Sequence, residues 1–178
     1  MKGIVCILFL FSYTVSAQSY KTESGEAIFH SKVPLHSFTG SSEHLIGLIN
    51  LDAKTVDFYL DLATLDTGIG KRDRDMRETL ETDKHPFAEF FGKLVSDFDP
   101  SISKKQTVMV EGDFKIHGVK RNVRIDGTLQ MTDQGLQLYA SWILKLADYN
   151  IKPPQILFVK VDQEQEIEIK AILTPTEN

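Results

Sequence analysis

The chain has little cysteine, little proline and none of the short patterns that mark the common catalytic sites. Its 178 residues include 1 cysteine, 6 prolines and 1 tryptophan. The cysteine, Cys6, lies in the apolar N-terminal run, so the rest of the chain must be stabilised by packing without disulfides. A G-x-S-x-G elbow and a Gly-rich phosphate loop are both missing from the sequence. These absences argue against the common hydrolases and nucleotide-binding enzymes, and we predict a protein that is not an enzyme.

The histidines and carboxylates do not form a pattern typical of a metal or catalytic site. The histidines are His30, His36, His44, His85 and His117, and no two have the short spacing that places two ligands on one helix face or strand. His30 and His44 could meet across neighbouring strands, although isolated polar histidines are the simpler interpretation. Asp73 and Asp75 are flanked by arginines, which suits ion pairs better than acid-base chemistry. We predict no catalytic residues, no metal site and no cofactor.

Long apolar runs are confined to the N-terminal region. Residues 1–17 combine Lys2, an apolar stretch over residues 3–11 and small residues before Gln18, which is the pattern of a cleaved secretory signal peptide. No stretch approaches the roughly 20 apolar residues that a membrane-spanning helix needs. The sequence therefore predicts a periplasmic or secreted protein without stable membrane insertion. Its mature part would be a single domain formed by residues 18–178.

Basic residues are in the minority. The chain has 20 Lys and Arg against 25 Asp and Glu, so removing Lys2 with the signal peptide changes the net charge from −5 to −6. Nucleic acid is therefore not an expected partner, because phosphate binding needs clustered Lys and Arg. The densest basic cluster comprises Lys71, Arg72, Arg74 and Arg77, interleaved with acidic residues. A solvated helix face explains this cluster, and contact with an anion or a lipid headgroup is the alternative.

Alternation of apolar and polar residues dominates the rest of the chain. This period of two is the signature of strands with one buried face. The apolar rows include Val56, Phe58, Leu60 and Leu62; Val108, Val110, Gly112, Phe114 and Ile116; Val123, Ile125, Gly127, Leu129 and Met131; and Leu138, Ala140, Trp142 and Leu144. Consecutive antiparallel strands in this number form a sandwich or close on themselves, and closure removes exposed edges. We predict an all-β fold, an antiparallel barrel of about eight strands that can hold one small ligand.

One charged, helix-like insert interrupts the β pattern. Good helix formers occupy residues 71–82, where Met76 and Leu80 form a short apolar stripe at i,i+4 spacing. The stripe is too narrow for a core helix, so the helix should lie at an edge or plug an opening. Pro86 cannot continue a helix and biases the preceding residue out of the α region, so the helix should stop a few residues earlier. A strand can then begin at Phe87.

Three stretches of this chain have a recognisable form: LDTGIGKRDRDMR at residues 65–77, HPFAEF at residues 85–90 and IHGVKRNV at residues 116–123. Together they resemble the YceI-like family, and the resemblance runs in order along nearly the whole mature chain. It implies a secreted or periplasmic protein with a lipocalin-like antiparallel β-barrel, in which some members bind a polyisoprenoid chain. Asp75 stands where many relatives have histidine, and residues 146–150 read LADYN where many read RSDFG. The fold tolerates both changes.

The apolar rows should face the barrel interior. Their opposite faces carry charges of both signs at high density, unlike an outer-membrane barrel, whose apolar face points outward. The candidate lining residues are Phe58, Leu60, Phe90, Phe114, Ile116, Leu129, Trp142 and Leu144. They fit a packed core or a lined tunnel equally well. Gly112 and Gly127 each remove a side chain from an inward row, which favours a cavity, although glycine also marks bends in barrels.

The leading hypothesis is a non-enzymatic carrier of a polyisoprenoid, a prenyl quinone or a similar long apolar lipid. Such a chain would be held by burial of its methyl and methylene groups, at about 0.8 kcal/mol per CH₂ before the costs of binding. The alternative is a structural or interaction module with a filled core. As a carrier, the protein would use the insert at residues 67–86 to cover one end of the barrel. Met76 and Leu80 would then form a lid, with Gly68 and Gly70 as hinges.

Overall fold

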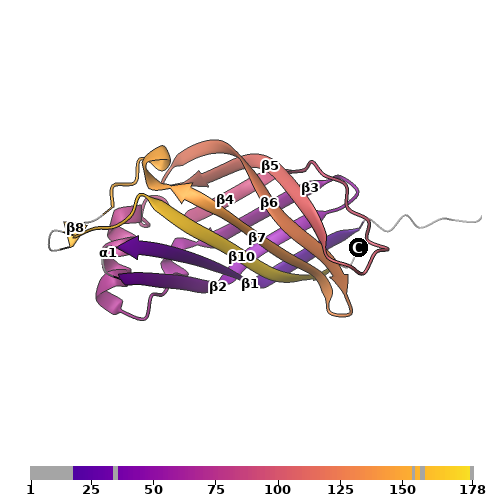
Figure 1. The fold of residues 1–178 in the computed structure, drawn as a ribbon, viewed down its shortest axis with the longest axis horizontal. Helices are drawn as coiled ribbons and strands as arrows, with labels where there is room; N and C mark the ends of the chain where they lie inside the picture. Colours follow the sequence, from indigo (N-terminus) through magenta and orange to yellow (C-terminus); the bar gives the residue numbers. More distant parts are fainter. Residues whose placement is uncertain (1–17, 34–35, 154, 157–158, 177–178) are drawn as a thin grey trace, which may run out of the picture.

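The fold is a closed antiparallel β-barrel with one helix at its end. The computed structural model describes residues 18–33, 36–153, 155–156 and 159–176. The predicted signal peptide at residues 1–17 lies outside the described residues. Eight strands close into the barrel in the order β1-β10-β7-β6-β5-β4-β3-β2 (Figure 1). The predicted all-β barrel of eight strands with one short helix is confirmed.

The barrel is a meander, because each strand pairs with the next barrel strand along the chain and the last returns to the first. The barrel strands are β1 (Ser19–Val33), β2 (His36–Asn50), β3 (Thr55–Asp61), β4 (Phe87–Leu94), β5 (Gln106–Ile116), β6 (Val119–Thr132), β7 (Gly135–Lys145) and β10 (Glu164–Pro175). Pairing of β1 with β10 closes the sheet, with Phe29 opposite Ile167. The short strands β8 (Gln155–Ile156) and β9 (Val159–Lys160) form a separate hairpin before β10.

Turn chemistry fixes the register of the hairpins. His117 and Gly118 have φ values of 53° and 73° between β5 and β6, as a two-residue turn with positive φ at both positions requires. This is the tight turn that the sequence predicts. Two short 3₁₀ helices, η1 (Leu62–Thr64) and η2 (Leu146–Tyr149), leave β3 and β7 at the same end of the barrel.

Gly112 serves close strand packing and does not open the cavity. It lies directly opposite Gly92 across the β4–β5 pair, and a Cβ on Gly112 would come within 2.4 Å of the Gly92 Cα. Gly112 therefore does not support the inference of a cavity, and its missing side chain allows the close approach of the two strands. Gly127 does line the interior, although a Cβ there would lie 2.6 Å from the Tyr139 carbonyl oxygen.

The helix α1 (Gly70–Leu80) lies across one end of the barrel, away from the C-terminal end of β10 (Figure 1). It is shorter at its end than the predicted 71–82, because Glu81 adopts a left-handed conformation with φ 50° and ψ 47°. The Glu81 N–H group donates to the carbonyls of Arg77 and Glu78, which satisfies two carbonyls of the last turn. Strand β4 begins at Phe87, as predicted.

The apolar face of the sheet points inward and the charged face outward. Ion pairs cross the outer surface of neighbouring strands, for example between Arg124 Nε and Glu111 Oε2 at 2.8 Å and between Lys115 Nζ and Glu89 Oε2 at 2.9 Å. Inside, the apolar residues of all eight barrel strands form one core cluster. Among the described residues, no helix is long and apolar enough to cross a membrane.

Candidate functional site: an apolar cavity inside the barrel

The barrel interior is hollow. It contains a cavity of about 260 Å³ lined by side chains from all eight barrel strands and from α1. Every lining residue proposed from the sequence lies on its wall: Phe58, Leu60, Phe90, Phe114, Ile116, Leu129, Trp142 and Leu144. Seven of them are buried, at 2% to 8% exposure, and Trp142 is partly buried. The structure therefore brings together on one surface the residues that alternation places on separate strands.

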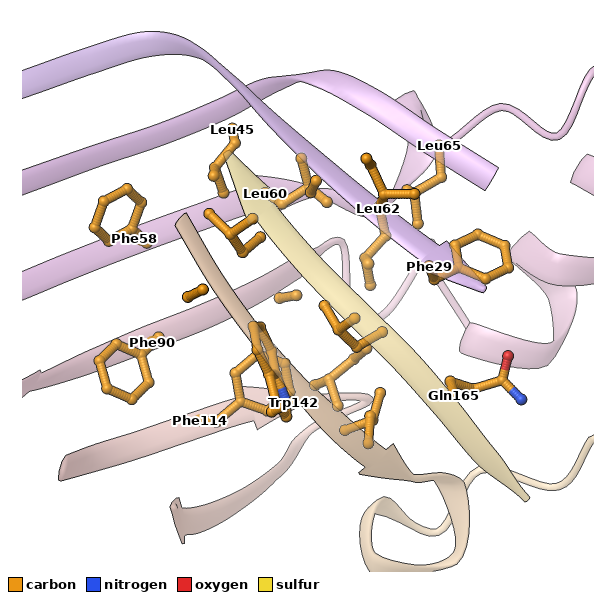
Figure 2. Close-up of a pocket in the computed structure, with 18 of the residues that line it drawn as sticks. Phe29, Leu45, Phe58, Leu60, Leu62, Leu65, Phe90, Phe114, Trp142 and Gln165 are labelled. Carbon is orange, nitrogen blue, oxygen red and sulfur yellow. The ribbon is translucent and has the colours of Figure 1, made fainter. Parts of the chain in front are cut away.

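The cavity follows the strands for much of their length because every second residue faces inward. On β7 the lining residues are Leu138, Ala140, Trp142 and Leu144, which span about 20 Å of strand at about 3.3 Å per residue. Figure 2 shows Phe58 and Phe90 on one side of the cavity and Phe29 near α1 on the other. A cavity of this shape suits a long, thin apolar molecule.

Aromatic rings form a cluster in the cavity wall. Phe114 meets Trp142 edge-to-face, with ring centroids 5.8 Å apart (Figure 2). Behind the cavity lining, Phe114 meets Tyr149 in the same way at 5.6 Å. Edge-to-face contacts fix ring orientation and add stability beyond area burial. Tyr149 is 4% exposed, and burial raises the pKa of its phenol. The Trp142 indole Nε1 is buried without a hydrogen-bond partner among the described residues.

One end of the cavity is covered by α1. Met76 and Leu80, the residues assigned to a lid, both line the cavity, and Leu80 is 9% exposed. Arg72, Asp75 and Thr79 line the same end, so the apolar stripe has a polar border. The helix thus lies over one end of the cavity, where the narrow apolar stripe predicts either an edge position or a plug.

The start of the insert is attached to the barrel by polar contacts. The Asp73 carboxylate accepts hydrogen bonds from the Thr67 hydroxyl at 2.6 Å and from the Thr67 N–H group at 2.9 Å. The hydroxyl bond is the main cause that lowers the pKa of Asp73 below its usual value. Asp66 pairs with Ser41 of β2 through two backbone hydrogen bonds of 2.9 Å, and the Arg72 guanidinium lies 4.3 Å from the centre of the Phe38 ring.

Three of the four basic residues of α1 are engaged in local contacts. Lys71 pairs with Asp75 at 3.0 Å, four residues along the helix. Arg77 donates to the Ala63 carbonyl oxygen at 3.2 Å. These contacts, and the stacking of Arg72, favour the solvated helix face over an anion site as the interpretation of the cluster.

The described histidines remain apart from any metal constellation. His30 lies 3.1 Å from the Thr39 hydroxyl and 3.3 Å from a Glu168 oxygen, so it does not meet His44 across the sheet. His85 and His117 approach with ring centroids 5.7 Å apart. Within the part of the chain that the structure describes, no group of three or more His, Cys, Asp or Glu residues could hold a metal ion.

Sequence reasoning missed the contribution of β1, β2 and the start of β10. The cavity residues from these strands include Ala27, Phe29, Ser31, Leu45, Ile49 and Gln165. Register shifts in the β1–β2 pairing on both sides of Gly25 interrupt the alternation there. Ser31 and Gln165 are polar residues in inward rows, so a search for apolar rows passes over them.

The comparison with protein families decides the relationship. The model of the YceI-like domain matches residues 13–173. The chain belongs to the YceI-like family. Curated proteins give no match.

Solved structures with the same fold include other YceI-like proteins. A polyisoprenoid-binding domain from Saccharophagus degradans, implicated in plant cell wall breakdown, aligns with a TM-score of 0.74 and 16% identity over 90% of this chain and 99% of its own. BcnA of Burkholderia cenocepacia aligns at 0.70 and 16% identity, covering 85% and 96%. The YCEI protein of Campylobacter jejuni aligns at 0.56 and 12% identity, covering 99% and 94%. At these identities the likeness establishes the fold.

Proposed function

We propose that this YceI-like protein binds and carries a polyisoprenoid or a similar long apolar lipid inside its barrel. The observation that carries the proposal is the hollow interior, a cavity of about 260 Å³ walled by aliphatic and aromatic side chains. Burial of apolar surface supplies the affinity for such a ligand, so chain length matters more than chemical detail. A polyisoprenoid-binding domain from another organism has the same fold, which supports this ligand class.

The cavity volume argues against a module with a filled core. An apolar cavity of about 150 Å³ is large enough to bind benzene, a molecule of six carbons. The cavity of about 260 Å³ therefore has room for more than one five-carbon isoprene unit. A ligand in the cavity would gain dispersion contacts along its whole wall.

We infer binding without catalysis. Catalysis on a lipid inside the barrel needs a pair of polar groups deep in the cavity that can move protons. The lining from Phe58 and Phe90 to the far end, at Leu94 and Val108, is apolar. Its charged members, Arg72 and Asp75, belong to α1 at the opposite end.

We place this activity in the periplasm or outside the cell, on the basis of the signal-peptide pattern in residues 1–17 and the location that the family resemblance implies. A lipid carrier has a role where two membranes, or a membrane and an external target, are separated by water. N-terminal sequencing of the exported protein checks the location, and the expected first residue is Gln18 or a close neighbour. A cytosolic protein that retains Met1 would contradict the assignment.

Lipid extraction tests the binding function directly. The full-length protein, purified from its native host without added lipid, is extracted with organic solvent and the extract is analysed by mass spectrometry. A polyisoprenoid or another long apolar lipid is expected in stoichiometric amount. Absence of lipid in repeated preparations, together with no uptake of added prenyl quinone, would reject the proposal and leave the interaction module as the function.

A further inference from the structure

Two polar side chains, Ser31 on β1 and Gln165 on β10, line the cavity at its α1 end, where the strand walls are otherwise mostly apolar. Along β1 the inward residues are Ala27, Phe29 and Ser31, and along β10 they include Gln165 and Ile167. Ser31 and Gln165 lie directly opposite each other in the β1–β10 register. The two rows therefore become polar at the same level, next to α1.

The Ser31 hydroxyl is an unsatisfied buried group. Ser31 is 0% exposed, lines the cavity, and its Oγ has no hydrogen-bond partner among the described residues. Most buried polar groups in native proteins have a partner, because an unmade hydrogen bond in the interior costs free energy. An alanine at this position would avoid that cost. The hydroxyl is therefore placed to form a hydrogen bond with a polar group of a ligand inside the cavity.

The Gln165 amide is held with its oxygen available. Gln165 is 6% exposed and lines the cavity. Its Nε2 donates to the Asp162 carbonyl at 2.8 Å and to its neighbour Glu164 at 3.3 Å. These bonds fix the amide so that Oε1, which accepts no hydrogen bond from the described residues, is turned to the side of Phe29 (Figure 2). The amide thus offers an acceptor on the residue that lies opposite Ser31 in the register.

Trp142 adds a donor one layer deeper. It pairs with Ile167 on β10, whereas Gln165 pairs with Leu144, so the indole lies two residues further into the barrel. Its buried Nε1 also lacks a partner among the described residues. From the α1 end inward, the wall therefore offers an acceptor and a hydroxyl in one layer and an N–H donor in the next.

We propose that Ser31 and Gln165 form a headgroup subsite for an uncharged end group that both donates and accepts hydrogen bonds, as the hydroxyl of a long-chain prenol does. The inference rests on the proposed function, because the apolar tail must occupy the rest of the cavity. The ligand would lie with its tail toward Leu94 and its hydroxyl beside α1. Gln165 Oε1 would accept from that hydroxyl, and Ser31 would donate to it.

A charged headgroup fits this end less well. Arg72 and Asp75 bring one charge of each sign to the cavity lining. Asp75 is paired with Lys71, and the Arg72 guanidinium stacks on Phe38. A diphosphate next to Asp75 and the Gln165 carbonyl oxygen would face acceptors where it needs donors.

Three probes with the same C20 tail test the subsite: geranylgeraniol, its methyl ether, which only accepts, and its diphosphate. Binding to the delipidated full-length protein is followed by the fluorescence of Trp142, its single tryptophan. We expect the alcohol to bind about tenfold tighter than the ether, the worth of about one hydrogen bond. The alcohol and the ether can both accept from the Ser31 hydroxyl, so Ser31→Ala should weaken the binding of both by about threefold to tenfold and keep the preference between them, while the urea midpoint stays the same or rises. In Ser31→Ala with Gln165→Met the preference should vanish.

Ser42→Ala is the matched control. Ser42 is also a buried serine, at 4% exposure, but its hydroxyl bonds Thr64 at 2.6 Å. This variant should lower the urea midpoint and leave the affinities for both the alcohol and the ether unchanged. Equal binding of alcohol and ether to the unmodified protein would overturn the subsite while sustaining the carrier function, and so would tightest binding of the diphosphate. Failure of all three probes to bind would reject the carrier function itself.

Discussion

The two ends of the barrel are closed in different ways. At the far end, Leu136 and Leu173 face each other across β7 and β10 and are both 0% exposed. At the α1 end the interior is covered by a helix whose Met76 is only partly buried, and the wall carries the Ser31 hydroxyl, which has no hydrogen-bond partner among the described residues. Packed side chains fill the far end, whereas α1, a helix outside the sheet, covers the other end.

The difference shows where a closed barrel can open. Strands joined by a continuous hydrogen-bond ladder can part only at the cost of many bonds, but a helix laid over the end can move without disturbing the ladder. The polar contacts of α1 lie near both of its ends: Asp73 accepts from Thr67 near the start, and Arg77 donates to the Ala63 carbonyl in the last turn. Leu80 adds apolar contact with the cavity, so movement of that end requires the Arg77 bond to break.

The largest effect is expected from the far end. Leu136→Ala removes a fully buried side chain that does not line the cavity, so it should cost about 3 to 5 kcal/mol of unfolding free energy. Urea unfolding followed by circular dichroism measures the loss. Lipid affinity of the folded protein should be unchanged. A loss of less than about 1 kcal/mol of unfolding free energy would mean that the side chains at this end are not closely packed.

Trp142→Ala probes the wall between the two ends and should cost less. A packed tryptophan truncated to alanine loses about 3 to 5 kcal/mol, but one side of Trp142 faces the cavity and makes no contacts there. We expect a loss of about 2 kcal/mol in the lipid-free protein. Trp142→Phe is the control, since it retains an aromatic partner for Phe114. Fluorescence of the unmodified protein should change when an apolar ligand binds, and no change would place the indole outside the ligand site.

Sequence reasoning reached the strand number and most of the wall, for a physical reason. Residues such as Phe58, Phe114 and Leu144 can be recognised in the sequence because apolar and polar residues alternate along their strands. Closure of the sheet then places these residues on one inner surface. Gly112 was misread because its role depends on Gly92, which lies opposite in space and distant in sequence. Ser31 was missed because it is a polar residue in an inward row, and its place on the cavity wall follows only from the folded arrangement.

Mutation of the predicted lid residues should change the free energy of unfolding less than the substitutions above, and it should change the ligand off-rate more. Met76→Ser with Leu80→Ser removes the apolar stripe but leaves the eight-stranded ladder intact, so we expect a loss of about 1 to 2 kcal/mol. Release of bound geranylgeraniol should accelerate about tenfold or more, because the open state becomes more populated. Leu136→Ala is the control, a less stable protein with an intact lid. If the double variant unfolds at much lower urea with an unchanged off-rate, α1 is part of the core.

The smallest effect is expected from the attachment of α1 and depends on pH. The pKa of Asp73 is lowered in the folded protein from an unperturbed 3.8, so its stabilising contribution is present above that value and is lost as the pH falls through the lower folded pKa. Asp73→Asn should therefore cost about 1 kcal/mol at pH 7, and the difference from the unmodified protein should shrink once the pH falls below that range.

Asp75→Asn is the control for charge, since Asp75 pairs with the exposed Lys71 and such pairs contribute only about 0.3 to 0.5 kcal/mol. Hydrogen exchange of the Thr67 amide, which donates to Asp73, reports the attachment locally, and urea unfolding reports it globally. In Asp73→Asn the Thr67 amide should exchange faster at neutral pH while the amides of β7 do not. Equal acceleration at Thr67 and in β7 would mean that α1 and the barrel open together. In that case α1 would not be a cap that can move independently of the barrel.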